Sequence, residues 1–402
     1  MPAPLRPLQV SVARTAEGLR IAVSDPLGLL DQALLLTPEL YWIACHLDGA
    51  SSLEELLPRL RERAPEIDEQ LLRDAVRELD RHLLLDSPRF RRARDQARER
   101  FLAAGRREPR HAEGNYPAEG DACREHLDEL CAAAPADREP APLAVRAVVS
   151  PHIDFGRGGE IYARTWGPLR ELRRPPRRVI ALGTSHAPLD GCFGFCPLPY
   201  ATPFGVLPHD QGAVEHLRAA LPEAAHGEAL CHRHEHSLEF QAVWSAYAFG
   251  APRFVPLLVG SFLDAEDPAA PPRAQPWLEP WIDALSSALA ELADAETTFV
   301  AGVDLAHIGP HFGDEDPLEP ERLRSLAHAD EASLRALESG DADAFWSSVA
   351  ADGDARRVCG LAPLYLLLRT LEKLPRASAQ RRGYAQCTSP DQCVSIAGMW
   401  FS

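Results

Sequence analysis

Three histidines in this sequence each stand shortly after an apolar run of the kind that forms a buried strand. They are His152, His186 and His307. The runs that precede them are, in the same order, 144–149, 179–182 and 299–303. Imidazole is the commonest protein ligand for metals, and it titrates near neutral pH. These residues could therefore bind a metal ion or transfer a proton.

The elements around these histidines predict where they meet. A fourth apolar run, 254–259, and the helical stretches between the runs indicate an α/β domain with a mostly parallel sheet covered by helices on both faces. Ligands of such sheets bind beyond the carboxyl ends of the strands. We therefore expect the three imidazoles at the same edge of one sheet.

A cysteine late in the chain is a candidate for a third ligand. Two imidazoles hold a divalent metal weakly, so an anionic ligand is needed, and a carboxylate or a thiolate would serve. Cys359 precedes an apolar helical stretch, 361–368, and a helix N-terminus favours a thiolate. A single cysteine is more often a small buried apolar residue. Both interpretations of Cys359 stay open at this point.

A polar tract at 231–239 holds three alternating histidines and two glutamates. His232 and His234 fit a polar loop that leads into an amphipathic helix. Glu235 and His236 stand next to the expected start of that helix. For these two residues, a place in the loop and a place in a binding site are equally consistent with the sequence.

Composition and charge restrict the partners. The chain has 402 residues, 46% hydrophobic and 25% charged, as in a soluble globular protein of two or three domains. A net charge of −17 repels phosphate and argues against nucleic-acid or membrane binding. No apolar run reaches the ~20 residues that cross a bilayer, and the first 15 residues lack a signal peptide's apolar stretch. We expect a cytoplasmic location.

Residues 1–88 predict a separate small α+β domain. Alternating polarity at 8–24 indicates a hairpin, and Ser52 with Glu55 forms a capping box at the start of a helix. The expected helices cover 37–47, 53–63 and 68–82, and a closing strand is expected at 83–85. This order is typical of a winged helix. The Arg-rich segment 89–107 predicts a connecting helix.

The segment LTPELYWIACHLDGASSLEELLPRL (36–60), with the helix after it, resembles the PqqD-like winged helices. That family binds leader peptides of ribosomally made peptides by adding a strand to its sheet edge. The resemblance implies that residues 1–88 bind a peptide or protein partner. A small structural domain is the alternative.

Eight motifs after residue 107 resemble, in the same order, those of the Memo family, called AmmeMemoRadiSam system protein B in prokaryotes. They are EPRHAEGNYPAEGDACREHLDEL (108–130), SPHIDFGRGGEIYA (150–163), LGTSHA (182–187), TPFGVLPHD (202–210), EHSLEFQ (235–241), VDLAHIG (303–309), CGLAPL (359–364) and GYAQCTSPDQCVSIAGMWF (383–401). Together they indicate a Memo-like domain at 108–402. The prokaryotic name implies radical-SAM and AMMECR-type partner proteins.

The resemblance implies a fold like that of class III extradiol dioxygenases, which hold non-haem Fe(II) with two histidines and a carboxylate. A cysteine replaces the carboxylate in the Memo family. His152, His186 and Cys359 are then the implied metal ligands. His307 matches the catalytic acid–base histidine of the dioxygenases. Asp304, beside it, could orient His307 or a ligand.

This sequence departs from the family pattern directly after His152, where Ile-Asp-Phe replaces Ala-Gly-Tyr. Asp154 thereby adds a carboxylate that could face the substrate. We expect Asp154, Glu235 and His236 to be the substrate-binding residues.

The resulting hypothesis is a redox enzyme that uses iron(II), with copper or zinc as competing metals. A thiolate is a soft ligand, so Cu(I) competes for such a site. The rival hypotheses are a non-catalytic peptide-binding adaptor and a zinc hydrolase, since zinc accepts two histidines and a cysteine and activates water. In a further alternative, the N-terminal domain recruits a peptide whose side chains the Memo-like domain modifies.

Overall fold

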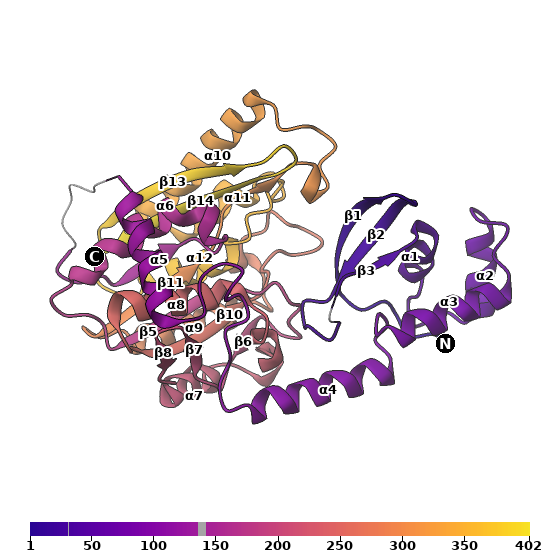
Figure 1. Ribbon diagram of the computed structural model, residues 1–402, viewed down its shortest axis with the longest axis horizontal. Coiled ribbons are helices and arrows are strands. Elements are labelled where there is room, and N and C mark those ends of the chain that lie inside the picture. Colours follow the sequence, from indigo (N-terminus) through magenta and orange to yellow (C-terminus); the bar gives the residue numbers. More distant parts are fainter. Residues whose placement is uncertain (31, 136–141) are drawn as a thin grey trace. The chain divides into compact units, whose positions relative to one another are not determined.

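The computed structural model describes residues 1–402 except Asp31 and 136–141. The chain divides into two compact units, 1–104 and 105–402, which are coloured indigo to purple and purple to yellow in Figure 1. No helix among the described residues is long and apolar enough to span a membrane.

The first unit contains an antiparallel sheet with the strand order β1–β2–β3, followed by four helices. The strands are β1 (Gln9–Thr15), β2 (Gly18–Ser24) and β3 (Leu34–Leu36), and the helices are α1 (Pro38–Cys45), α2 (Leu53–Arg61), α3 (Glu69–Arg81) and α4 (Pro88–Ala103). The predicted hairpin and the capping box of Ser52 and Glu55 are both confirmed. Apolar side chains of α1, α2 and α3 form one core with side chains of β2 and β3.

Two details of this unit differ from the expectation. The closing strand at 83–85 is wrong, since only an isolated bridge joins Leu5 and Leu85. Leu83 has a φ of 57°, a left-handed conformation that interrupts an extended strand. Helix α4, expected to connect the domains, belongs to the first unit. Its Phe90 is buried and lies under the guanidinium of Arg6 at 4.7 Å.

The second unit is a three-layer α/β structure around a nine-stranded sheet, counted over the described residues. The strand order is β12–β14–β4–β11–β5–β10–β6–β9, and β13 pairs with β14. The strands are β4 (Ala147–Ser150), β5 (Arg178–Thr184), β6 (Phe193–Phe195), β9 (His226–Gly227), β10 (Arg253–Val259), β11 (Thr297–Gly302), β12 (His307–Ile308), β13 (Ala379–Thr388) and β14 (Cys393–Phe401), with a separate hairpin of β7 (Tyr200–Thr202) and β8 (Gly205–Leu207). The four predicted apolar runs are the parallel strands β4, β11, β5 and β10. The predicted mostly parallel sheet is thereby confirmed.

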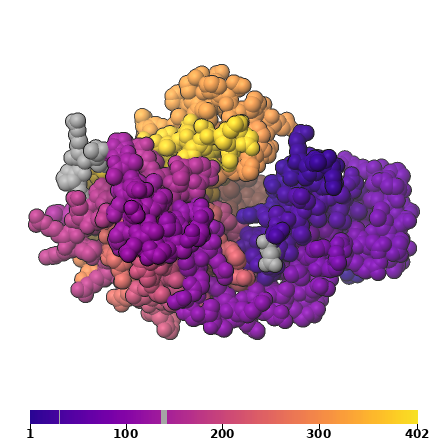
Figure 2. All heavy atoms as spheres, in the orientation of Figure 1, coloured from indigo at the N-terminus to yellow at the C-terminus, as the bar shows by residue number. Residues whose placement is uncertain are grey.

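Helices cover both faces of this sheet (Figure 1). They are α5 (Gly120–Ala133), α6 (Phe155–Trp166), α7 (Gln211–Ala219), α8 (His236–Phe249), α9 (Glu279–Glu291), α10 (Pro320–Ser339), α11 (Ala342–Ala350) and α12 (Leu361–Leu371). Helices α6 and α8 pack on one face, and α12, with α9 and α11 behind it, packs on the other. In Figure 2 the C-terminal hairpin (yellow) lies at the surface beside α10 (orange), where Arg381 pairs with Glu331 and Glu338.

Two strand glycines let α8 start close to the sheet. A Cβ atom on Gly183 of β5 would stand 2.5 Å from Ser237 Oγ, and one on Gly302 of β11 would stand 2.4 Å from Ser237 O. Real Cβ atoms essentially never approach other atoms so closely. The absence of side chains at these two positions therefore brings the first turn of α8 to the carboxyl ends of β5 and β11.

A buried ion pair fastens the start of the second unit to α8. Arg107 and Glu239 form a salt bridge in which both side chains are at most 1% exposed. The Glu239 carboxylate also accepts hydrogen bonds from the Arg110 and His111 amides, at 2.9 and 2.8 Å, and from the Tyr116 hydroxyl. Four donors from one segment thus converge on a single carboxylate.

The substitution Glu239→Gln tests this anchor. Arg107 would keep its charge in a fully buried position without a counter-charge, so we expect the unit 105–402 to lose about 3 kcal/mol of unfolding free energy. Urea denaturation followed by tryptophan fluorescence measures the loss. Glu160→Gln is the matched control, because Glu160 is 57% exposed in its pair with Arg164. A loss no larger than that of the control would contradict the proposed anchoring role.

Candidate metal centre

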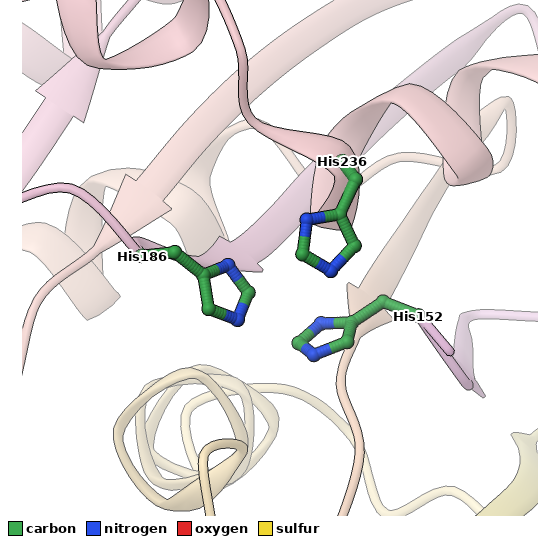
Figure 3. Close-up of side chains that lie close together, drawn as sticks. All are labelled: His152, His186 and His236. Atoms are coloured by element: carbon green, nitrogen blue, oxygen red, sulfur yellow. The ribbon is translucent and has the colours of Figure 1, made fainter. Parts of the chain in front are cut away.

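Three imidazole rings converge at the carboxyl edge of the parallel sheet (Figure 3). One ring nitrogen from each of His152, His186 and His236 lies within 4.8 Å of the others. His152 follows β4, His186 follows β5, and His236 is the first residue of α8. The fold thus brings together two histidines expected as metal ligands and one expected to bind substrate.

The hydrogen bonds of two rings fix which nitrogen is available to a ligand. His152 Nδ1 lies 3.0 Å from the carbonyl oxygen of Gly302, and His186 Nδ1 lies 2.9 Å from Glu235 Oε1. Both partners can only accept, so each Nδ1 carries a hydrogen and each Nε2 is the nitrogen left for a metal ion. Metal-binding histidines commonly have this arrangement, with the outer nitrogen bonded to a carbonyl or carboxylate.

Cys359 lies beside this cluster. Its Sγ is 3.4 Å from His152 Nε2 and 3.5 Å from the carbonyl oxygen of Asp304. The sequence suggested that the start of α12 favours a thiolate here. Burial and the nearby Asp304 instead raise the pKa of Cys359 well above its usual value. Without a bound cation the sulfur is therefore a neutral thiol.

Asp304 and His307 lie at the same sheet edge, after β11. The buried Asp304 Oδ1 accepts the amides of His152 and Ile153 at 2.8 and 3.1 Å, and its Oδ2 lies 3.6 Å from His152 Nε2. Burial raises the pKa of Asp304. His307 Nδ1 lies 3.2 Å from the carbonyl oxygens of Leu305 and Arg357, which leaves its Nε2 available.

Burial gives the three rings different protonation behaviour. Burial and the neighbouring charge of His186 together lower the pKa of His152 to about 3. Burial and His186 also hold the pKa of His236 well below its usual value. Burial alone would lower the pKa of His186, but the Glu235 carboxylate outweighs it and raises that pKa. One ring is thus paired with a carboxylate, and the other two stay neutral.

Glu235 was expected to bind substrate, but its carboxylate is committed to the protein. It caps α8 through the Ser237 amide at 2.9 Å and accepts the His186 amide at 2.8 Å, besides holding the His186 ring. Asp154 likewise caps α6 and pairs with Arg157 at 2.5 Å. His232 is buried between Tyr200 Oη and the carbonyl oxygen of Gly194.

His236 was predicted as a substrate-binding residue, and its place among the rings of the metal centre was not predicted. The signal available in the sequence was the pair Glu235 and His236 at the start of a helix. Whether this pair joins the site depends on how closely α8 approaches β5 and β11. Gly183 and Gly302 carry that information, and neither stands out in the sequence.

The titration of His186 tests the role assigned to Glu235. Glu235→Gln removes the charge that outweighs burial, so the His186 pKa should fall below its ordinary value of about 6.5. NMR titration of the ring protons in metal-free protein measures the change. Glu223→Gln, which alters an exposed glutamate, should leave the His186 titration unchanged. An unaltered His186 pKa in Glu235→Gln would refute the assignment.

Comparison with known proteins identifies the family of this chain. The Memo-like protein family matches residues 107–400. A MEMO1 family protein of Aquifex aeolicus is 24% identical over 388 residues, which is 96% of each chain, and one of Thermus thermophilus is 30% identical over 231 residues, 57% of this chain and 63% of that protein. An uncharacterized Escherichia coli protein, JW3007, is 17% identical with a TM-score of 0.40, covering 63% of this chain and 99% of that one. Because the family match covers most of the chain, this protein belongs to the Memo-like family.

Proposed function

We propose that the second unit is a metal-dependent redox enzyme whose centre holds non-haem iron(II). The observation that carries this proposal is the convergence of three imidazoles with the Cys359 sulfur beside them. His152, His186 and Cys359 would hold the metal, with His236 as a neutral neighbour. This donor set fits a transition metal, because both ligand rings bond the protein through Nδ1 and leave Nε2 for the metal, and a thiolate is a soft anionic ligand.

The surrounding residues have separate roles in this proposal. A bound iron(II) ion would supply one-electron redox chemistry and open positions for substrate. Glu235 and the Gly302 carbonyl orient the two ligand rings through their Nδ1 atoms. Burial lowers the pKa of His307, so its ring is neutral at pH 7 and its Nε2 can accept and return a proton. Asp304 fixes the backbone of His152.

Metal analysis of anaerobically purified protein tests the centre. We expect iron in the wild-type chain and at least a tenfold lower metal content in His186→Ala and Cys359→Ser, since each removes a ligand. Cys192→Ser is the matched control, because Cys192 is a buried free cysteine outside the cluster. Unchanged metal content in both ligand variants would reject the site. Loss in His236→Ala but not in Cys359→Ser would identify a centre of three histidines.

The alternative functions give different results in the same preparations. A zinc hydrolase would be active with Zn(II) and inactive with Fe(II). An adaptor would bind metal reversibly, show no turnover under oxygen and bind a peptide tightly. Copper retained in place of iron would keep the redox proposal and change only the metal.

The first unit has an observation of its own that favours peptide binding. In the described part of the chain β1 is an edge strand, because it pairs only with β2. Val10 and Val12 lie on the same face of β1 and are 44% and 68% exposed. An exposed strand edge with adjacent apolar side chains can accept an extended peptide as a further strand. We propose that this edge recruits a peptide partner.

Peptides selected from a random library on the full chain test this second proposal. Val12→Asp places a charge on the apolar face of β1 and should weaken their binding at least tenfold. Ser11→Asp adds the same charge on the opposite face of the same strand and should leave binding unchanged. Equal binding to wild type and to Val12→Asp would exclude the β1 edge as the docking site.

A further inference from the structure

A cavity of about 290 Å³ adjoins Cys359 within the second unit. It lies between the ends of β5 and β10, the loop 354–359 and the start of α12. Cys359 forms part of its wall, and the Sγ of this residue lies 3.4 Å from His152 Nε2. The cavity is thus at the carboxyl edge of the parallel strands, where α/β proteins bind their ligands. Its volume is near the lower end of the range for small-molecule pockets, roughly 300–1,000 Å³.

Most of the cavity wall is apolar, formed by Val259, Phe262, Leu263, Val358, Leu361 and Ala362. The hydroxyl groups in the wall already have partners. Thr184 Oγ1 donates to the Cys359 carbonyl at 2.9 Å, and Ser185 Oγ donates to the Ala187 carbonyl at 2.7 Å. Such a lining favours a ligand with an apolar body.

The two charged residues in the wall differ in how their charges are balanced. Arg357 donates from Nε to the His307 carbonyl at 3.0 Å and pairs with Asp314. The Asp354 carboxylate accepts the Val358 amide at 2.8 Å, and among the described residues no arginine, lysine or histidine forms a salt bridge with it. Burial raises the pKa of Asp354, and the nearby charges of Arg356 and Arg357 oppose that rise. Asp354 therefore presents at the cavity a carboxylate that has no salt bridge in the described part of the chain.

The backbone around these residues is held in an unfavourable conformation. Asp354 and Arg357 have φ angles of 56° and 53°, in the left-handed region that non-glycine residues seldom adopt. Arg356, between them, anchors the loop through a buried salt bridge of 2.6 Å to Asp330. Strained residues that the surrounding structure holds in place cluster at ligand sites. Here both of them line the same cavity.

We propose that this cavity binds a compact apolar molecule with one ammonium group, which pairs with Asp354 while the apolar body lies next to Cys359. Such an amine would be the organic substrate of the neighbouring centre, so its role as substrate rests on the proposed function. The binding itself requires only the cavity and the Asp354 charge. It can therefore be measured in the absence of any metal.

Ligand-observed NMR on the full, metal-free chain tests the proposal with three probes of similar shape: 2-phenylethylamine, 2-phenylethanol and phenylacetate. We expect 2-phenylethylamine to bind, the neutral alcohol to bind at least tenfold more weakly, and phenylacetate not to bind. Asp354→Asn should remove the preference for the amine. Asp352→Asn is the matched control, because Asp352 lies in the same loop, is exposed and does not line the cavity.

A second variant keeps the test independent of any effect of Asp354→Asn on folding. Ser261 is exposed and lines the cavity, so Ser261→Phe should fill the space and abolish amine binding. Binding of phenylacetate in place of the amine, binding of no probe, or equal losses in Asp354→Asn and Asp352→Asn would each overturn the proposal. Amine binding, together with metal analysis of the anaerobically purified protein that finds no bound metal, would support the pocket while rejecting the redox function.

Discussion

Two buried carboxylates one helical turn apart, at the start of α8, position most of the site. Glu235 accepts hydrogen bonds from the ring and amide of His186 and from the Ser237 amide. Glu239 holds the segment that begins the second unit, because it pairs with Arg107 and accepts a hydrogen bond from the Tyr116 hydroxyl. A buried carboxylate is tolerated only when its oxygens are hydrogen-bonded or ion-paired. The need for these partners therefore fixes the positions of the donors that surround each carboxylate.

The balance of charge around the rings explains why this edge suits a cation. Burial keeps His152 and His236 neutral and keeps Cys359 protonated. A metal ion that binds the sulfur must displace its proton, so metal affinity should rise with pH until the thiol is deprotonated. The same burial that raises the pKa of the thiol also strengthens the attraction between a bound cation and the resulting thiolate. A high thiol pKa and a metal site are thus compatible.

The sequence predicted those parts of the site whose signals are local. His152, His186 and His307 each follow an apolar strand, and the parallel sheet brings such positions to one edge. The location of His236 depended on the close approach of α8 to Gly183 and Gly302, which is a long-range contact. The strand expected at 83–85 was wrong because the left-handed backbone at Leu83 leaves no signal in an apolar run. The Cys359 thiolate was expected from the helix end alone, and burial, which the sequence does not state, outweighs that effect.

The loop before α12 connects the two binding regions of the second unit. Gly360 packs so tightly against the segment that follows β11 that a Cβ atom there would stand 2.7 Å from the Asp304 carbonyl oxygen. This contact places the Cys359 sulfur beside the same carbonyl, and the salt bridges of Arg356 and Arg357 hold the rest of the loop. The same loop therefore presents its cysteine to the histidines and its aspartate to the cavity. Movement of the loop would displace the sulfur and Asp354 together, so ligand binding in the cavity and metal binding at the rings should be energetically coupled.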